Sequence, residues 1–379
     1  MKVCILVSNS LKKDPRVIKQ IKICLSEGHD VYFIGYRDKN YDKNFLDNVG
    51  CNLEMIDLGE KYVGYLPNIF MKIKRRWCWF YNPIGIMKKI KPDIIHANDF
   101  DMLPSAYFAA LQTKSKIVYD SHEIFCENIN MQNSKIIKSL CKVFERYLVK
   151  RIDAMISVSN AAAKYFSDLY KIKTPTVITN CPYSVEISEL KVKVNTFSAI
   201  YSGIMIENRG YEEYVESAIY LDNNIKLALL GYGPIIEKLK EQSIANNTDN
   251  KVSFEEPVEI ADLVPTVSKF HVGVVVTKPA NINFIYTISN KLFEYVQARV
   301  PVIMSDVPEH RYFNEKFNFG IIIDEVTPIK IAEAINRLAS DKELYNKLKN
   351  NCENMANEMC WEKESRKLLE IYSYLYNSK

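Results

Sequence analysis

The sequence predicts an α/β protein built from two doubly wound domains, each a mostly parallel sheet covered by helices. The chain has 379 residues, which is long for a single domain of roughly 100–200 residues. Short β-branched runs alternate with longer amphipathic segments, as in sheets whose parallel strands are joined by helices. This alternation occurs twice, on either side of a polar stretch without periodicity at residues 180–195. Two domains in tandem are therefore expected.

The first half contains six short apolar runs that we predict to be strands. They span residues 2–8, 30–34, 92–97, 116–120, 153–158 and 176–179. Between the first two, Val17, Ile18, Ile21 and Leu25 recur at helical spacing, which predicts a helix over residues 14–27. Gly28 follows directly, and glycine commonly ends helices. These elements predict a first domain over residues 1–180.

The second half repeats the pattern after a linker predicted at residues 181–196. Its expected strands span residues 199–202, 225–230, 271–276, 300–304 and 320–323. The end of the chain, residues 361–376, reads as a charged amphipathic helix. We therefore expect a second domain over residues 197–360 and a closing helix over residues 361–379.

The composition is that of an ordinary globular chain. Hydrophobic residues make up 47% and charged residues 25%, which excludes disordered and fibrous proteins. The nine cysteines are scattered without a C-x-x-C pair, so we expect free thiols rather than disulfides or a zinc site. No apolar run approaches the ~18 residues of a membrane span, and the first run is too short for a signal peptide. We expect a cytoplasmic protein whose membrane association, if any, is peripheral.

The glycine pattern argues against the common dinucleotide and nucleoside triphosphate sites. After the first strand no glycine occurs until Gly28, so the G-x-G-x-x-G sequence of NAD-dependent dehydrogenases is absent. The P-loop sequence is absent as well. Gly231 and Gly233 form a G-x-G after a predicted strand, but Ile236 stands where a third glycine would be needed. A tight strand-to-helix turn explains this pair as well as a ligand loop does.

A set of short segments in a fixed order is more informative. The first half has D-P-R-V at 14–17, L-S-E-G-H-D-V at 25–31, P-D-I-I-H-A-N-D at 92–99, Y-D-S-H-E at 119–123 and R-I-D-A-M-I-S-V-S at 151–159. The second half has Y-S-G-I-M-I-E-N-R-G at 201–210, L-L-G-Y-G-P at 229–234, I-S-N-K-L-F-E-Y at 288–295 and V-P-V-I-M-S-D-V-P-E at 300–309. Along nearly its whole length the chain resembles the family 4 retaining glycosyltransferases of the GT-B fold.

The resemblance implies two Rossmann-like domains that face a cleft. It implies a nucleotide-sugar donor on the C-terminal domain, an acceptor mainly on the N-terminal domain, and a last helix that crosses back onto the first domain. Such enzymes stabilise the leaving diphosphate with fixed cations and helix N-terminal amides, so we expect neither a metal nor a cofactor.

Arg209 and Lys291 are the expected diphosphate-binding cations, since each follows a predicted strand. The plainer alternatives are a solvated loop arginine and a surface ion pair of Lys291 with Glu294. The resemblance implies that Glu294 accepts hydrogen bonds from the ribose hydroxyls of the donor. The remaining residues expected in the donor-site loops are Gly203, Gly231, Gly233 and Asn290.

Two positions on the donor side depart from the family pattern. Tyr286 stands where the family usually has a glutamate that contacts the sugar, eight residues before Glu294. Ile204 stands where many members have an arginine. The diphosphate is therefore expected to depend more heavily on Arg209 and Lys291, and the identity of the donor sugar is left open.

Polar residues also end two neighbouring strands of the first domain. The resemblance implies that His96, Asn98 and His122 surround the reacting sugar as catalytic residues. Asn98 replaces a histidine of many members, and an amide can bond a hydroxyl but cannot act as a base near neutral pH. Retaining enzymes of this kind are thought to let the leaving phosphate take the acceptor proton. For His122, a structural bond to Asp120 or to a loop carbonyl is the alternative.

Three further residues are candidates for the acceptor side. Asp99 and Glu123 stand next to the predicted catalytic residues, and Arg16 lies just past the first strand. Arg16 could bind a phosphate on the acceptor. A bond from Arg16 to a neighbouring carboxylate is the plain alternative.

Residues 61–91 are unusually basic and contain clustered aromatic residues. Cations beside tryptophans suit an anionic lipid interface, whereas a basic helix whose aromatics fill its own domain is the equally good alternative. Single-stranded nucleic acid would also fit this composition, but no nucleic-acid module occurs and we expect no such partner. The candidates for membrane contact are Lys74, Arg75, Arg76, Trp77 and Trp79.

The charge is divided unevenly between the halves. Residues 1–180 hold 28 Lys and Arg against 18 Asp and Glu, net +10, whereas residues 181–379 hold 22 against 28, net −6. A basic first domain suits an anionic membrane surface or a phosphate-bearing acceptor.

The leading hypothesis is a retaining glycosyltransferase that moves a sugar from a nucleoside-diphosphate sugar to a hydroxyl of a glycan or lipid-linked saccharide. Its expected setting is cell-surface polysaccharide synthesis at the inner face of the membrane. One alternative is a GT-B nucleotide-sugar epimerase or hydrolase. Another is a non-catalytic nucleotide- or glycan-binding partner of a second transferase, which the departures at Tyr286 and Asn98 keep open.

Overall fold

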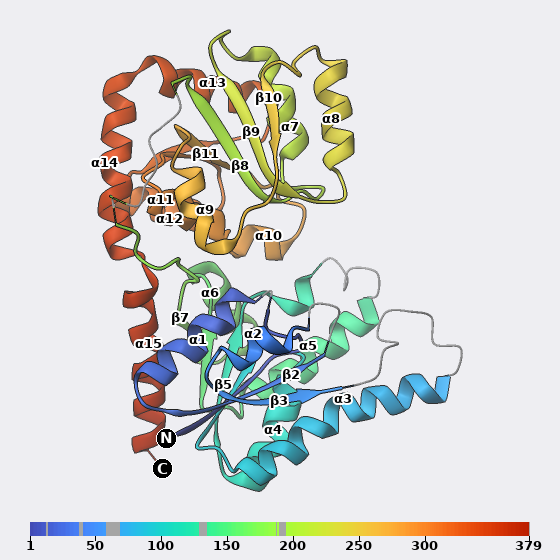
Figure 1. The fold of residues 1–379 in the computed structure, drawn as a ribbon. Coiled ribbons are helices and arrows are strands. Elements are labelled where there is room, and N and C mark those ends of the chain that lie inside the picture. Colours follow the sequence, from blue (N-terminus) through green and yellow to red (C-terminus); the bar gives the residue numbers. More distant parts are fainter. Residues whose placement is uncertain are drawn as a thin grey trace. The chain divides into compact units, whose positions relative to one another are not determined.

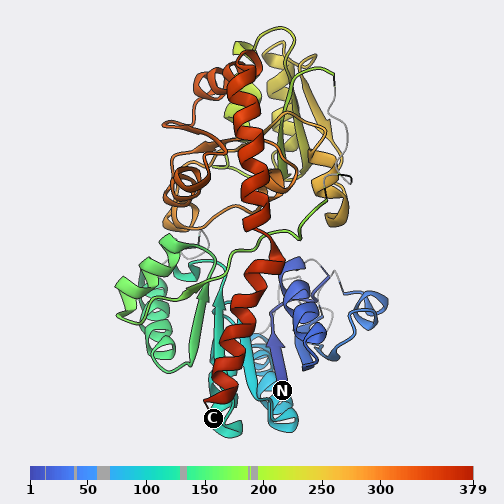
Figure 2. The same ribbon diagram turned by 90° about the vertical axis from the view of Figure 1, so that its left-hand side faces the viewer.

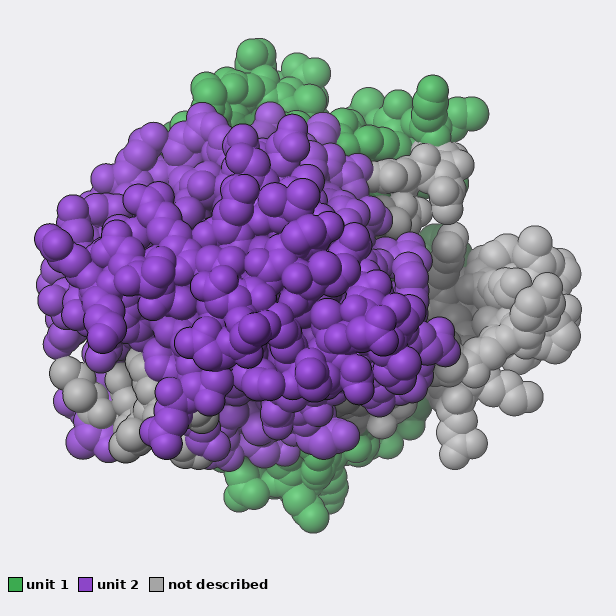
Figure 3. Space-filling view, turned by 90° about the horizontal axis from the view of Figure 1, so that it is seen from above, with its two compact units in different colours: residues 1–179, 365–379 green, residues 180–364 purple. Residues whose placement is uncertain are grey.

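The computed structural model describes residues 1–12, 14–37, 41–57, 69–128, 135–186, 188 and 195–378, with the backbone alone for residues 69–76. The chain divides into two compact units (Figure 3). Unit 1 comprises residues 1–179 and 365–379, and unit 2 comprises residues 180–364. Of the linker predicted at residues 181–196, residues 187 and 189–194 lie outside the described part.

Unit 1 contains a seven-stranded parallel sheet in the order β3-β2-β1-β4-β5-β6-β7 (Figure 1). The strands are β1 (Lys2–Leu6), β2 (Asp30–Tyr36), β3 (Asn52–Ile56), β4 (Ile94–Asn98), β5 (Lys116–Ser121), β6 (Ala154–Ser157) and β7 (Thr176–Val177). The order reverses between β1 and β4, which is where open parallel sheets bind ligands.

The helices of unit 1 connect these strands. They are α1 (Pro15–Ser26), α2 (Lys43–Asp47), α3 (Ile69–Ile90), α4 (Leu103–Thr113), η1 (Phe125–Glu127), α5 (Lys135–Val149) and α6 (Asn160–Tyr170). The final helix α15 (Trp361–Asn377) enters unit 1 at Ser365, and Figure 2 shows its C-terminal part beside the strands of this unit.

The start of α1 illustrates how the sequence sets a helix boundary. The side chain of Asp14 accepts a hydrogen bond from the amide of Val17 at 3.3 Å, and Pro15 occupies the first helical turn. Gly28, just past the last turn, has a positive φ of 72°. The helix predicted over residues 14–27 is therefore present, between an N-terminal cap and a glycine stop.

Unit 2 contains a six-stranded parallel sheet in the order β10-β9-β8-β11-β12-β13, which reverses between β8 and β11. Its strands are β8 (Ser198–Ile204), β9 (Lys226–Tyr232), β10 (Val252–Glu255), β11 (Val272–Val275), β12 (Val302–Ser305) and β13 (Gly320–Ile323). Its helices are α7 (Tyr211–Glu216), η4 (Ser217–Tyr220), α8 (Ile236–Ala245), α9 (Ile260–Val267), α10 (Ile282–Tyr286), α11 (Asn290–Gln297), α12 (Pro308–Phe317), α13 (Pro328–Ser340) and α14 (Lys342–Glu358).

Two apolar layers cover the sheet of unit 2, one on each face. Tyr201 and Leu229 belong to one buried cluster, whereas Ile200 and Leu230, their neighbours along the strands, belong to the other. Successive residues of a strand point to opposite faces, so strands covered on both sides must be apolar throughout. The fold class predicted from the sequence, two doubly wound α/β domains, is confirmed.

The two strands that the sequence analysis missed are the edge strands β3 and β10. Glu54 in β3 and Ser253 in β10 are exposed, so neither strand reads as a continuous apolar run. All nine cysteines lie in the described part and none is paired with another, as expected. Within that part, no helix combines the length and the apolar character needed to span a membrane.

Candidate functional site

A pocket of about 330 Å³ opens in unit 2 at the carboxyl ends of β8 and β9. The first turn of α11 forms another wall of the pocket. The lining residues are Ser202, Gly203, Ile204, Leu230, Gly231, Tyr232, Pro257, Val258, Leu263, Ser289, Asn290, Lys291 and Glu294. Five residues predicted for the donor side therefore lie together in one pocket: Gly203, Gly231, Asn290, Lys291 and Glu294.

Glycines allow the pocket wall to form. At Gly203, where φ is +115°, a Cβ atom would lie 2.8 Å from Nζ of Lys291 and overlap its Cε. At Gly231, where φ is +139°, a Cβ atom would overlap the carbonyl oxygen of Gly203. Only a residue without a side chain permits this backbone conformation and this close approach. Gly233 does not line the pocket but lies against the backbone of Met205.

Lys291 is held close to a second cation. Burial and the charge of nearby Arg209 lower the pKa of Lys291 to about 8, and Glu294 acts in the opposite direction. The ammonium group also lies 5.8 Å from the ring centre of Tyr201. Two like charges held together are unfavourable until an anion binds between or beside them. This electrostatic arrangement is typical of an anion-binding site.

Arg209 does not itself line the pocket, but the surrounding aromatic residues fix its position. The guanidinium carbon lies 3.8 Å from the ring centre of Phe284. The hydroxyl of Tyr201 bonds the backbone carbonyl of Arg209 and lies 2.7 Å from that of Val276. Stacking and backbone anchoring together reduce the entropy lost when the guanidinium binds a ligand.

Buried tyrosines beneath the pocket hold the end of β8 in place. The amide of Ser202 donates to the hydroxyl of Tyr295 at 2.8 Å, and the hydroxyl of Tyr211 donates to the carbonyl of Ser202 at 3.2 Å. The rings of Tyr201 and Tyr211 stack with centres 4.1 Å apart. The sequence analysis missed these tyrosines, because nothing in their spacing distinguishes them from ordinary core residues.

The N-terminus of α11 adds further positive potential. The helix begins at Asn290, and the side chain of the preceding Ser289 does not cap it. The first backbone amides of a helix lack partners within the helix and attract anions. Ser289, Asn290 and Lys291 all line the pocket, so the helix terminus and the ammonium group face the same space.

Both departures from the family pattern can be located. Ile204 lines the pocket and is half exposed, so an apolar side chain stands at its mouth. Tyr286 ends α10 and is not among the lining residues.

In unit 1, Asp120 at the end of β5 is the centre of a buried hydrogen-bond network. Its Oδ2 lies 2.7 Å from Nε2 of Gln20, 3.3 Å from Nε2 of His96 and 3.2 Å from Nε2 of His122. Burial alone would raise the pKa of Asp120, but the two histidines lower it well below its usual value. The carboxylate therefore stays ionised and orients both imidazoles.

His96 is fully buried, and both of its ring nitrogens have partners. Nε2 faces Asp120, and Nδ1 lies 2.6 Å from the hydroxyl of Tyr372 on α15. Because the carboxylate oxygen can only accept, Nε2 carries the proton and Nδ1 accepts from Tyr372. Local sequence pattern does not predict this contact, because Tyr372 is 276 residues away from His96 along the chain.

Asn98 is also fully buried. Its amide nitrogen donates to the carbonyl of Leu6 at 3.2 Å, and its oxygen lies 3.2 Å from Nε2 of His122. Of the three residues predicted to be catalytic, His122 alone is not fully buried, but its side chain is only 7% exposed; it contacts Asn98 directly and shares Asp120 with His96. The contact between His122 and Asp120 agrees with the structural alternative for His122, in which the imidazole is bound to Asp120. The catalytic role of all three stays a prediction.

The candidates for the acceptor side differ in exposure. Arg16 forms ion pairs with Asp99 at 3.2 Å and with Asp14 at 3.4 Å. This agrees with the alternative in which Arg16 is bound to a neighbouring carboxylate. Glu123 is exposed and accepts a hydrogen bond from the side chain of Asn128. Near this group, burial raises the pKa of Asp101 to about 6, with a further increase from Asp99, while a hydrogen bond from Ser8 opposes the shift.

The basic segment can be described only in part. Lys61 and the side chains of Lys74, Arg75 and Arg76 lie outside the described part. Trp77 is 55% exposed and stacks on Tyr81, with ring centres 4.8 Å apart. Trp79 instead stacks on Tyr36 of β2 at 5.7 Å, so it packs within unit 1. The two tryptophans therefore have different environments.

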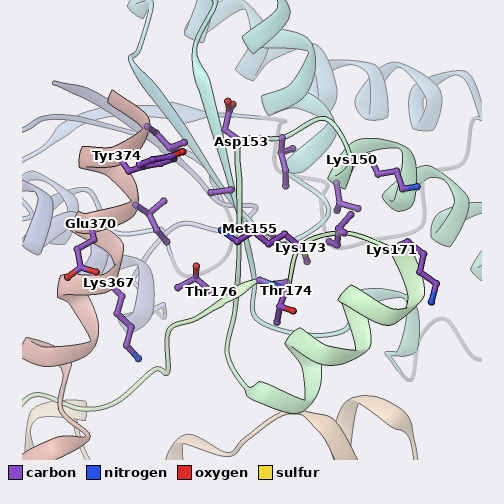
Figure 4. Close-up of a pocket in the computed structure, with 17 residues that line it drawn as sticks. Lys150, Asp153, Met155, Lys171, Lys173, Thr174, Thr176, Lys367, Glu370 and Tyr374 are labelled. Carbon is purple, nitrogen blue, oxygen red and sulfur yellow. The ribbon is translucent and has the colours of Figure 1, made fainter. Parts of the chain in front are cut away.

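A second pocket in unit 1, of about 730 Å³, lies beside Asp153 and Met155 at the start of β6 (Figure 4), whereas His122 follows the end of β5. Lys367, Glu370 and Tyr374 of α15 form one side, and residues 171–175 with Thr176 at the start of β7 form another. It contains none of the predicted site residues. Across the described ranges, no three His, Cys, Asp or Glu side chains form a group that could hold a metal ion.

Two family models match consecutive parts of the chain. The model described as Glycosyltransferase Family 4 matches residues 21–182, and the model described as Glycosyl transferases group 1 matches residues 185–355. The chain belongs to the family 4 glycosyltransferases. The first match covers most of unit 1, and the second covers most of unit 2 with its pocket.

Solved structures share the fold of this glycosyltransferase at low identity. A glycosyltransferase from Rickettsia africae is 16% identical, with a TM-score of 0.77, covering 100% of this chain and 99% of that one. HepE from Anabaena, crystallised with UDP and glucose, is 14% identical, with a TM-score of 0.77 and coverage of 99% and 100%. The lipopolysaccharide outer core galactosyltransferase WaaB is 14% identical, with a TM-score of 0.67 and coverage of 98% and 99%. The likeness shows the GT-B fold. Among curated proteins, none matches significantly.

The shifted pKa of Lys291 predicts how affinity for a nucleoside diphosphate depends on pH. A bound diphosphate favours the protonated amine, so the pKa of Lys291, about 8 in the free transferase, rises on binding. The affinity for UDP should be constant just below pH 8 and fall as the pH rises above it. Calorimetric titration of the protein with UDP measures this pH dependence of the affinity. It should be done at about three pH values below 8 and about three above it, over the range of roughly pH 7 to 9.5. Lys291→Arg, which keeps its charge, should remove the dependence, and an unchanged slope in that variant would contradict it.

Tyr372→Phe removes the donor to Nδ1 of the buried His96 and leaves that acceptor unsatisfied. We expect the free energy of unfolding to fall by about 1–3 kcal/mol in urea denaturation. Sugar transfer should also fall, because Asp120 and His122 lose part of their support, whereas UDP binding in unit 2 should not change. Tyr374→Phe, an exposed position on the same helix, is the matched control. Equal stability of the two variants would refute the network.

Proposed function

We propose that the protein is a retaining glycosyltransferase that transfers a sugar from a nucleoside-diphosphate sugar to a hydroxyl of a glycan or lipid-linked saccharide. The observation that carries the proposal is the pocket of unit 2, where Lys291 and the start of α11 provide positive charge and the charge of Arg209 acts on Lys291 from outside the lining. Sugar–diphosphate cleavage develops negative charge on the leaving phosphate, and preorganised cations and amides stabilise that charge most when they are fixed in advance.

Polar residues of the pocket and Arg209 beside it have specific roles in this proposal. Lys291 and Arg209 bind the diphosphate, and Glu294, one turn after Lys291, accepts hydrogen bonds from the ribose hydroxyls. Asn290 and the glycines at positions 203 and 231 let the phosphates approach the backbone. UDP is the proposed nucleotide, because HepE, which shares the fold, was crystallised with UDP and glucose.

In unit 1, we propose that His122 holds the transferred sugar. Its Nε2 is engaged with Asp120 and Asn98, whereas its Nδ1 has no hydrogen-bond partner among the described residues. With the proton on Nε2, Nδ1 is an unused acceptor, and because it is buried, a sugar hydroxyl could bond it only after the side chains that cover it move. The leaving phosphate would take the proton of the acceptor hydroxyl, so no separate base is needed. Arg16, Asp99 and Glu123 stay proposed contacts of the acceptor.

The proposed setting is the synthesis of a cell-surface polysaccharide at the inner face of the membrane. Its support is the charge of residues 1–180, net +10, which favours contact with anionic lipids or a phosphate-bearing acceptor. Lys74, Arg75, Arg76, Trp77 and Trp79 stay proposed membrane contacts. We propose no nucleic acid as a partner and no metal ion in the reaction.

Thermal-shift measurements with UDP-, GDP- and ADP-sugars test the donor. We expect a UDP-sugar to raise the melting temperature most, and Glu294→Ala to weaken its binding at least about tenfold, since the ribose loses a charge-assisted pair of hydrogen bonds. Glu237→Ala, an exposed glutamate on α8, is the matched control. Unchanged nucleotide affinity in Glu294→Ala would refute the ribose assignment.

The stereochemistry of the product tests the reaction. With a UDP-sugar and a panel of saccharide acceptors, NMR should show the product with the anomeric configuration of the donor. EDTA should leave the rate unchanged, because fixed cations replace a metal at the diphosphate. An inverted product or loss of activity in EDTA would contradict the proposal. Nucleotide release without transfer would favour a hydrolase or epimerase, and donor binding without any turnover would favour a non-catalytic partner.

A further inference from the structure

The helix α5 turns its apolar face toward solvent. Ile136, Leu140 and Val143 are each more than 60% exposed, and Phe144 and Tyr147 are exposed as well. Their spacing places them along one stripe of the helix. A helix of a globular domain normally buries such a stripe, and several large exposed side chains in contact mark an interaction surface.

Polar interactions on the opposite face fix this orientation. Lys138 and Lys142 each lie 2.6 Å from a carboxylate oxygen of Glu127. Glu145 is fully buried, and the hydroxyls of Tyr119 and Tyr170 donate to it at 2.9 and 2.6 Å. A rotation of α5 that buried the apolar stripe would break these bonds and expose the buried carboxylate. The outward stripe is therefore part of the fold.

The helix α4 packs against both α5 and α3, the helices labelled in Figure 1, and aromatic contacts between them extend the apolar surface from α5 to α3. Tyr147 of α5 lies against Tyr107 of α4, with ring centres 6.2 Å apart. Phe108, the next residue of α4, contacts Phe80 of α3 at 5.6 Å. The exposed apolar residues that continue this surface on α3 and α4 are Trp77, Tyr81, Phe108 and Leu111.

The charge around the stripe is positive. Between residues 135 and 151 the chain has six Lys and Arg and a single acid, the buried Glu145. Lys135, Arg146 and Lys150 are exposed, and the guanidinium of Arg151 lies 3.7 Å from the ring centre of Tyr147. Two copies of such a basic face would repel each other, whereas an anionic lipid surface complements both its charge and its apolar stripe.

We propose that α5, with the adjoining aromatic residues of α3 and α4, docks unit 1 onto an anionic lipid bilayer. The stripe enters the acyl boundary, tyrosine and tryptophan lie at headgroup level, and the flanking cations contact lipid phosphates. The helix follows the segment after β5, the strand whose end carries Asp120 and His122. A saccharide anchored in the same bilayer would thus be presented near that edge of the sheet.

Vesicle flotation with the full chain tests the proposal. Phosphatidylcholine vesicles containing about a quarter phosphatidylglycerol should bind the protein, and pure phosphatidylcholine vesicles should bind it far less. The double variant Leu140→Asp/Val143→Asp should bind at least about tenfold more weakly, because two charges would have to enter the acyl boundary. Ile244→Asp, at an equally exposed apolar position on α8, should bind like the parent.

Further measurements keep the result interpretable. Both aspartate variants should keep the free energy of unfolding of the parent in urea denaturation, which shows that both units still fold. Arg146→Glu should weaken binding to anionic vesicles alone, and added salt should weaken the parent in the same way. Vesicle binding that the double variant leaves unchanged, or no binding by the parent, would overturn the proposal. The proposal would also be overturned if the parent sediments as a dimer and the double variant sediments as a monomer. A second copy of the chain would then cover the stripe. Vesicle binding requires no sugar transfer, so this proposal and the proposed function can fail separately.

Discussion

The charge of Arg209 acts on the buried ammonium group of Lys291, and this repulsion between two cations is the main electrostatic constraint in unit 2. Gly203 leaves room for the lysine, and buried tyrosines fix the backbone on which both cations depend. The uncapped start of α11 adds to the same potential. The repulsion is a cost in the free protein, and an anion that relieves it gains that energy on binding.

Unit 1 uses the opposite arrangement, with one buried negative charge at its centre. Asp120 orients His96 and His122, and Tyr372 of α15 completes the network from the far end of the chain. The same unit carries the outward apolar stripe of α5, which ion pairs to Glu127 keep in place. Charge placement thus fixes the geometry of unit 1, and in unit 2 it leaves two like charges uncompensated.

The sequence predicted the features that depend on local pattern. Strands buried on both faces read as apolar runs, and polar residues after neighbouring strands, such as Asn98 and Asp120, were brought together because parallel strands end at one edge. The edge strands β3 and β10 were missed because their exposed residues break the pattern. The contact of Tyr372 with His96 was not predicted because it is non-local.

The most direct test of the central claim is a crystal structure of the protein with UDP bound. The account predicts phosphate oxygens within hydrogen-bond distance of Nζ of Lys291 and of the first amides of α11, with the guanidinium of Arg209 beside them. A nucleotide bound elsewhere in unit 2, or one whose diphosphate leaves Lys291 without contact, would contradict it.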